Sequence, residues 1–562
     1  MLSTLPVMRS PGARILFFGS ALLTAGILLW ANHLRWSGGT HGLTPIFFIL
    51  FAAGDYAGSN CGLLILLVAA CVQTKYSFRP LLRWFGEHPG RVASISVLVL
   101  CCGAWGVYRR SPLSMDEYSP VFQSRIFAAG HLAGQFPVPL LDWLVPRVFQ
   151  DYFLNISHSS GRIVSAYWPS FALLLTPFTW LGVPWICNPL ISALTLLAIH
   201  RLALRIFADV EAAGLALLLT VASPVFFANG ISFYSMPAHL LASTLFALLL
   251  LDPTPRKAFA AGVVGSIALT LHNPVPHMLF ALPWIVWILC RPRRLPMVGC
   301  LVAGYLPLCL LLGVGWFWFS SDLTHDALNL AAGAAASDDS LRKIGTAFTL
   351  PSATIVLARL IGIAKLWAWS VPGLLLLAGI GAWKWRHNTP CMLLLVSALL
   401  TLIGYFFVPF DQGHGWGFRY FHSAWVALPI LATAALLPAP AVRNIFADSE
   451  TRSFAVACAL LALVVGTGFR AVQMHTFIAQ DQSQVPAYSG AERRVVIIDP
   501  RSSFYGLDLV QNDPWLRGSV VRMITNGSAA DAQMMHEHFP ELHQVYSDPF
   551  GSVWSAAAAA PP

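Results

Sequence analysis

Charged residues are scarce in this 562-residue chain: Asp, Glu, Lys and Arg together make up only 10%. Soluble domains carry roughly 25% charged residues, so an ordinary water-soluble protein is excluded. Apolar residues make up 57% instead, with 20 Trp and 36 Phe. They recur in runs of about 17–25 residues, which is enough to cross a hydrocarbon core of roughly 30 Å. The composition therefore predicts an all-α polytopic integral membrane protein.

Two further absences narrow the function. The ten cysteines contain no Cys-x-x-Cys pair and lie mostly inside apolar runs, where buried free thiols are usual. The net charge of +9 does not indicate nucleic acid binding, because Lys and Arg occur in short clusters between apolar runs. The clusters include residues 75, 79, 83 and 91, then 201 and 205, 256 and 257, 291, 293 and 294, 384 and 386, and 443 and 452.

The apolar runs predict about 13 membrane spans with the N-terminus inside, because every short loop then expected inside carries Lys or Arg. Segment 167–182 is apolar, but it is short and contains two prolines, so we expect an interfacial helix on the outer face. The expected spans are 15–31, 60–74, 92–108, 186–206, 211–229, 233–251, 258–273, 275–290, 296–319, 356–383, 389–409, 421–438 and 453–469.

These spans divide the chain into three parts. Residues 1–91 hold the N-terminal spans, and residues 92–470 form the main transmembrane module, whose first outer loop is 109–185. Residues 471–562 lose the hydrophobic pattern and contain two strand-like runs, 494–498 and 519–524, which predict a small extracytoplasmic α/β appendage.

Two adjacent carboxylates, Asp116 and Glu117, follow the third expected span directly, and an amphipathic stretch comes after them. An arbitrary Asp-Glu pair is most often a solvated loop acid. Four longer stretches give this pair a context. They are DEYSPVFQSRIFAAGHLAG (116–134), GRIVSAYWPSFALLLTPFTWLG (161–182), NPLISALTLLAIHRLALRIF (188–207) and GFRYFHSAWVALPIL (417–431).

Together these stretches resemble the C-type (GT-C) superfamily of membrane glycosyltransferases. The nearest branch is that of the protein O-mannosyltransferases and lipid A aminoarabinose transferases, with related bacterial sugar transferases. The resemblance covers the order of spans, loops and motifs over residues 90–470. It departs from the family in its two extra N-terminal spans, in Ile163 where a proline is usual, and in the His272-Asn273-Pro274 sequence where relatives often have Arg-Pro.

The resemblance implies transfer of a sugar from a polyprenyl-phosphate-linked donor to a hydroxyl group of a glycan, lipid or protein. The expected site is the outer face of a bacterial inner membrane. The family's motif makes Asp116 the general base, with Glu117 orienting the acceptor. The candidates for the donor phosphate are Arg162, Arg419 and His272, and those for lining the substrate are Tyr167, Trp168 and Tyr420.

Simpler roles compete with these assignments. Arg162 can be an arginine that reaches the headgroups, and Tyr167 and Trp168 can be interfacial anchors. No cofactor is expected, although Asp116 and Glu117 with Asp151 or Asp411 could hold a divalent cation.

Two other functions remain open. A transporter should show repeated halves, broken helices and midplane carboxylates; the sequence shows no repeat, and we expect Asp55 in an outer loop or at a span end. A ligase or polymerase of lipid-linked glycans also uses outer-loop arginines. The chain could, besides, be a structural scaffold without activity.

Overall fold

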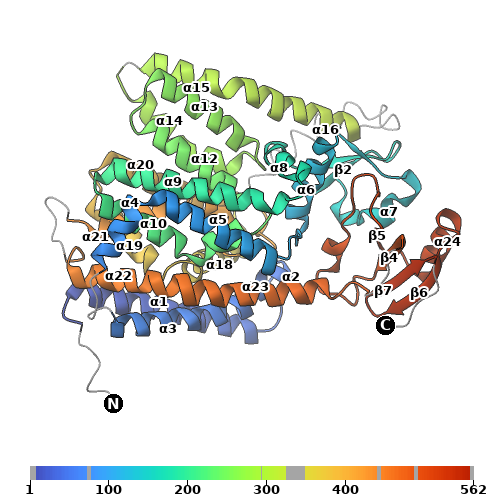
Figure 1. Cartoon of the computed structure of the whole chain (residues 1–562), viewed down its shortest axis with the longest axis horizontal. Coiled ribbons are helices and arrows are strands. Elements are labelled where there is room, and N and C mark those ends of the chain that lie inside the picture. The colour runs from blue at the N-terminus through green and yellow to red at the C-terminus, as the bar shows by residue number, and fades with distance from the viewer. Residues whose placement is uncertain are drawn as a thin grey trace.

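The computed structural model describes residues 8–72, 78–292, 294–324, 349–438, 445–486 and 492–556. Long helices lie side by side in one body, and a smaller region with strands lies at one end (Figure 1). Three residues of the expected basic clusters, Lys75, Arg293 and Arg443, lie outside the described residues.

Among the described residues, seven helices are long and apolar enough to cross a membrane, and one bent pair would make an eighth. The chain thus has the helices of an integral membrane protein, but the expected count of 13 spans is not confirmed. Several expected spans correspond to shorter helices, such as α12 (Met236–Leu250) and α14 (Val275–Leu289). The seven are Pro11–Trp36, Pro45–Val72, Pro89–Gly106, Pro184–Phe207, Arg294–Leu323, Thr389–Phe407 and Ser449–Gln482.

The bent pair consists of α10 (Val210–Val221) and α11 (Pro224–Gly230), which meet at 64°. Pro224 has no backbone N–H to continue the hydrogen-bond ladder, so the helix breaks before it. The expected interfacial segment contains α8 (Ser170–Trp180), an apolar helix too short to count as a span.

Small residues let neighbouring helices approach closely. Gly381 on α19 (Leu374–Lys384) packs against α21 (Ala427–Leu436), and a Cβ on it would lie 1.8 Å from the Leu431 carbonyl oxygen. Gly262 on α13 (Pro255–Leu269) packs in the same way against α15 (Arg294–Leu308). Such contacts are typical of helix packing in membranes.

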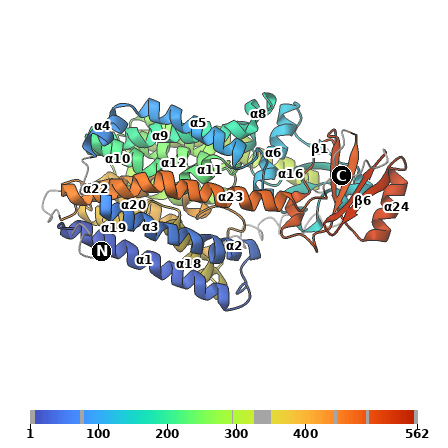
Figure 2. The ribbon, with the colours of Figure 1, turned by 60° about the horizontal axis from the view of Figure 1, so that its bottom comes forward.

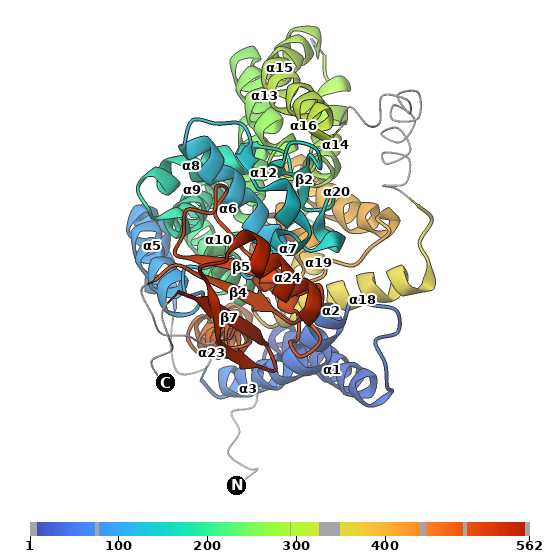
Figure 3. The same cartoon turned by 90° about the vertical axis from the view of Figure 1, so that its right-hand side faces the viewer.

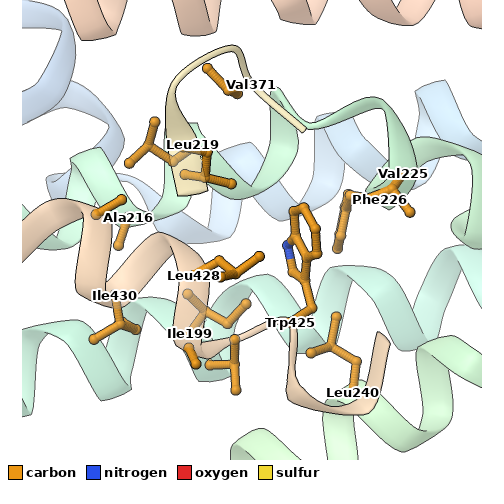
Figure 4. Packing of buried hydrophobic residues seen from close by; sticks show 14 of the residues in the cluster. Ile199, Ala216, Leu219, Val225, Phe226, Leu240, Val371, Trp425, Leu428 and Ile430 are labelled. Carbon is orange, nitrogen blue, oxygen red and sulfur yellow. The ribbon is translucent and has the colours of Figure 1, made fainter. Parts of the chain in front are cut away.

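The largest apolar cluster lies inside the helical body, where Trp425 is fully buried. Figure 4 shows its indole among Ile199 of α9 (Cys187–Phe207), Leu240 of α12 and Phe226 of α11. Helices distant in sequence therefore share one core, which positions the loops at their ends.

Asp55 lies within the helix that runs from Pro45 to Val72, in its π-helical segment η2 (Leu50–Asp55), so its expected place in a loop or at a span end is wrong. The carboxylate is fully buried. Its Oδ2 is 2.8 Å from Lys365 Nζ, and its Oδ1 is 3.0 Å from Arg470 Nη2 and accepts from Trp369 Nε1 at 2.5 Å. The helix begins about fifteen residues earlier than expected because Pro45 opens it.

The C-terminal strands form a four-stranded sheet in the order β5-β4-β7-β6, with one helix, α24 (Ser528–His538). The strands are β4 (Arg494–Ile498), β5 (Val520–Ile524), β6 (His543–Asp548) and β7 (Gly551–Ser555).

This sheet lies beyond the end of α23 (Thr467–Gln482) (Figure 2). Seen from that end, it lies next to α6 (Met115–Ala128) and α7 (Leu141–Leu144) (Figure 3). The same region holds a three-stranded sheet of β1 (Gly134–Gln135), β3 (Arg162–Ser165) and β2 (Leu154–Ile156).

Candidate functional site

Asp116 stands in the first turn of α6, where the helix dipole favours a carboxylate. Its Oδ2 forms an ion pair with Arg419 Nη2 at 2.8 Å, and its Oδ1 accepts a hydrogen bond from the Tyr167 hydroxyl. The Asp116 side chain is 20% exposed, whereas that of Arg419 is 5% exposed. The carboxylate therefore forms the accessible face of the pair.

Arg419 opens the short 3-10 helix η9 (Arg419–Ala424) and is held by the loop before it. Its backbone N–H donates to Gln412 Oε1 at 3.0 Å, and its Nη2 also donates to the Gln412 carbonyl. The guanidinium lies 4.4 Å from the Tyr234 ring centroid, within the range of a cation–π contact. These contacts fix the cation before any ligand arrives.

Gly415 makes room for this arginine. A Cβ at position 415 would lie 2.4 Å from Arg419 Cδ and Nε, and the φ angle of +140° is one that residues with side chains rarely adopt. Arg419 Nε has no hydrogen-bond acceptor among the described residues. The guanidinium therefore keeps one unused donor.

The ion pair sets the charge of both partners. Burial alone would raise the pKa of the Asp116 carboxyl, but the Arg419 guanidinium is the main influence that brings it below its usual 3.8. Burial likewise disfavours the charged form of Arg419, but Asp116 together with Tyr234 and Tyr420 more than offsets this, so the pKa of the arginine rises. Asp116 is a carboxylate at neutral pH.

The Tyr167 and His272 rings lie together, with centroids 4.0 Å apart. Desolvation lowers the pKa of His272 to about 4, so its imidazole is neutral at pH 7. Trp168 is next to them, since its backbone N–H is 3.5 Å from the His272 carbonyl oxygen. Four expected site residues, Asp116, Arg419, Tyr167 and His272, are thus brought together, with Trp168 beside them.

Glu117 contacts a different set of groups. It is fully buried and accepts from Tyr108 Oη at 2.8 Å, from Leu113 N at 2.9 Å and from Phe233 N at 2.9 Å. Burial raises the pKa of its carboxyl to about 7 despite these donors. These hydrogen bonds join the start of α6 to the loop before α12 and so help to position Asp116.

Arg162 and Tyr420 have other hydrogen-bond or ring partners than the ion pair, although Tyr420 lies close enough to Arg419 to help raise its pKa. Arg162 is exposed at the start of β3, with its guanidinium 5.8 Å from the Phe319 ring centroid. Tyr420 stacks on Tyr405 with centroids 4.3 Å apart, and its hydroxyl donates to the Asp411 carbonyl at 2.8 Å.

Sequence reasoning missed the groups that hold the site together. Tyr234 supports Arg419, and its hydroxyl lies 2.7 Å from His414 Nδ1. Asp508, in η11 (Gly506–Leu509) of the C-terminal unit, accepts from Met115 N at 2.6 Å and so caps α6. A capping partner 393 residues away leaves no local signal in the sequence.

No group of three or more His, Cys, Asp or Glu that could hold a metal ion occurs in the part of the chain that the structure describes. Asp411, an expected partner for a cation, accepts from Thr44 N at 2.7 Å and from Gly413 N at 2.8 Å. Its two oxygens therefore organise the loop that carries Gln412.

No protein-family model matches the chain, and no curated protein matches it. Two crystal structures of ArnT from Cupriavidus metallidurans are similar to it, one bound to undecaprenyl phosphate and one in the apo state. Each is 14% identical in sequence and covers 84% of this chain and 99% of its own. The TM-scores are 0.49 and 0.47.

Proposed function

We propose that this protein is a membrane glycosyltransferase that moves a sugar from a polyprenyl-phosphate-linked donor to an acceptor hydroxyl group. The proposal rests on the residues of the site and on the sequence motifs that resemble the GT-C superfamily. The single observation that carries it is the ion pair between Asp116 and Arg419, which joins a partly exposed carboxylate to a buried permanent cation. This reaction needs those two charges: a proton acceptor and a partner for the departing phosphate.

In the proposed reaction the acceptor oxygen attacks the anomeric carbon of the sugar. The bond from that carbon to the phosphate oxygen breaks, and the polyprenyl phosphate leaves with the bonding electrons. Asp116 takes the hydroxyl proton as the new bond forms, and Arg419 contacts the phosphate oxygens, for which a guanidinium is a bidentate partner.

A carboxylate with a low pKa is a weak base, and the ion pair offers a way to strengthen it. A phosphate at Arg419 competes with Asp116 for the guanidinium, whose Nε still lacks an acceptor among the described residues. As Arg419 turns its charge toward the phosphate, Asp116 loses the influence that lowers its pKa. Its basicity then rises when the donor is in place.

The other candidates have supporting roles in this proposal. The Tyr167 hydroxyl holds one oxygen of Asp116, which leaves the carboxylate a fixed orientation. Neutral His272 and the neighbouring Trp168 line the sugar, for which aromatic faces are suitable partners. Arg162 meets the donor lipid at the periphery, and Glu117 supports α6.

The test is a transfer assay with the full chain purified in detergent. Polyprenyl phosphate carrying different labelled sugars is offered, and products are separated by mass. Cell-envelope glycans from strains with and without the gene identify the natural sugar and acceptor. The proposal predicts release of polyprenyl phosphate in step with glycosylated product. The proposal would be rejected if the strain without the gene kept every envelope sugar and the purified protein turned over none of the donors.

A further inference from the structure

A hollow with a cavity volume of about 420 Å³ lies far from Asp116. This is within the range of small-molecule sites. It is formed where α9 and α12 end and α13 begins. Its lining residues are Arg201, Leu204, Arg205, Leu248, Leu249 and Lys257.

The hollow is at the opposite end of the helical body from the ion pair. Helix α12 begins two residues after Tyr234, which contacts Arg419, and ends at Leu250. At 1.5 Å per residue, its fifteen residues span about 22 Å. A ligand in this hollow therefore cannot be the phosphate that meets Arg419.

Positive charge dominates the rim of the hollow. Arg205 is paired with Asp252 at 2.9 Å, and Lys257 Nζ donates to the Asp252 carbonyl at 3.1 Å. Arg201 stands one turn before Arg205 on the same face of α9, and its side chain forms no ion pair or hydrogen bond within the described residues. Three cations thus face one carboxylate, which leaves a net charge of +2.

The N-terminus of α13 adds to this field. The helix starts at Pro255, with Lys257 in its first turn, so the positive end of its dipole lies beside the cations. The Lys257 N–H is already capped by the Thr254 hydroxyl. The remaining lining is apolar and comes from the three leucines of α9 and α12. A ligand that fits must therefore carry a negative group next to hydrocarbon.

We infer that this hollow binds the phosphate headgroup of an anionic membrane glycerophospholipid, with Arg201 as its principal free contact. The leucines accommodate the upper part of the acyl chains, and the cations hold the phosphate. Basic hollows between helix ends are suited to such lipids. A zwitterionic lipid carries the same phosphate but adds an ammonium group, which the net positive charge of the rim repels.

The experiment uses the full chain in detergent, equilibrated with phosphatidylglycerol or with phosphatidylcholine of the same acyl chains. Bound lipid is counted by native mass spectrometry. We expect preferential retention of phosphatidylglycerol, weakened about fivefold by Arg201→Gln, since one basic side chain contributes on the order of that factor. Arg256→Gln is the matched control, because Arg256 is an exposed neighbour that does not line the hollow.

Three results would overturn the inference. Equal retention of both lipids would show that the net charge of the rim does not select the lipid. Equal effects of Arg201→Gln and Arg256→Gln would show that retention depends on general surface charge and not on this hollow. Displacement of phosphatidylglycerol by millimolar glycerol phosphate would show that the site takes a free phosphate ester. Thermal unfolding without added lipid checks that both variants fold. Lys257→Gln is a second test variant, and we expect it to weaken the retention of phosphatidylglycerol to a similar extent.

Discussion

Asp116 and Arg419, 303 residues apart in the chain, form an ion pair with an Nη2–Oδ2 distance of 2.8 Å. The pair exists because α6 and η9 meet at one end of the helical body. Its partners differ in accessibility, since the carboxylate is partly exposed and the guanidinium is not. In the proposed reaction, this asymmetry gives the proton-accepting role to Asp116 and makes Arg419 the group that sets the pKa of Asp116.

The pH dependence of transfer tests that tuning. Asp116 acts as the carboxylate, so activity falls as the pH drops through its pKa, which Arg419 lowers. Arg419→Gln removes the cation, and burial then raises the pKa of Asp116. The acid limb of kcat/KM should move to higher pH in Arg419→Gln and stay near the wild-type position in Arg419→Lys. Identical acid limbs in all three proteins would contradict the proposed coupling.

A substitution of Arg162 tests whether this residue only helps to bind the donor lipid or takes part in the transfer step. The side chain is exposed near Phe319, so Arg162→Ala should raise the KM for the polyprenyl-phosphate donor several-fold and leave kcat unchanged. Steady-state kinetics with varied donor separate the two parameters. A lower kcat would place Arg162 in the reacting centre, and no change in either would leave it with a purely interfacial role.

Asp508 links the C-terminal unit to the start of α6, the helix that carries Asp116. Burial raises the pKa of its carboxyl well above the usual value. Asparagine has nearly the same shape and keeps an acceptor oxygen. Asp508→Ala should lower kcat several-fold and cost about 1 kcal/mol, the usual effect of losing a helix cap. Asp508→Asn, which still accepts from Met115 N, should restore both. Kinetics and thermal unfolding of the two variants provide the comparison.

Asp55 tests stability in the membrane domain. Asp55→Asn leaves Lys365 and Arg470 buried beside each other without a counter-charge, which should cost about 3–5 kcal/mol. Asp142→Asn is the matched control, since its partner Arg147 is exposed and surface ion pairs contribute little to stability. Unfolding of both variants in detergent measures the difference, and equal stability would show that the buried cluster contributes little.

The sequence predicts the helical membrane class and the main pair of the site for different reasons. Scarce charged residues and long apolar runs indicate directly that most of the chain lies in a lipid bilayer. Asp116 and Arg419 each stand in a motif that resembles a known family, and this singled them out before their contact was visible. Asp55 could not be placed, because neutralisation by Lys365 and Arg470 depends on chain segments more than 300 residues away.

Glu117 shows a second limit. The sequence presents it as the equal of Asp116, yet successive helix residues point about 100° apart. One carboxylate therefore meets Arg419 while the other accepts three internal hydrogen bonds. The hydrogen bond from Met115 N to Asp508 and the contact of Tyr234 with Arg419 likewise depend on how distant segments pack, so the sequence does not show them.

The central claim is that Asp116 accepts the proton of the acceptor hydroxyl. Its most direct test is the initial rate of sugar transfer by purified Asp116→Asn, with Asp142→Asn as the control for losing one outer carboxylate. Asparagine keeps the size of the side chain and cannot take the proton. The account predicts a rate at least about 100-fold lower than that of the wild type, with donor binding retained. Thermal unfolding should occur at a lower temperature, because the buried Arg419 loses its counter-charge. A wild-type rate in Asp116→Asn would contradict it.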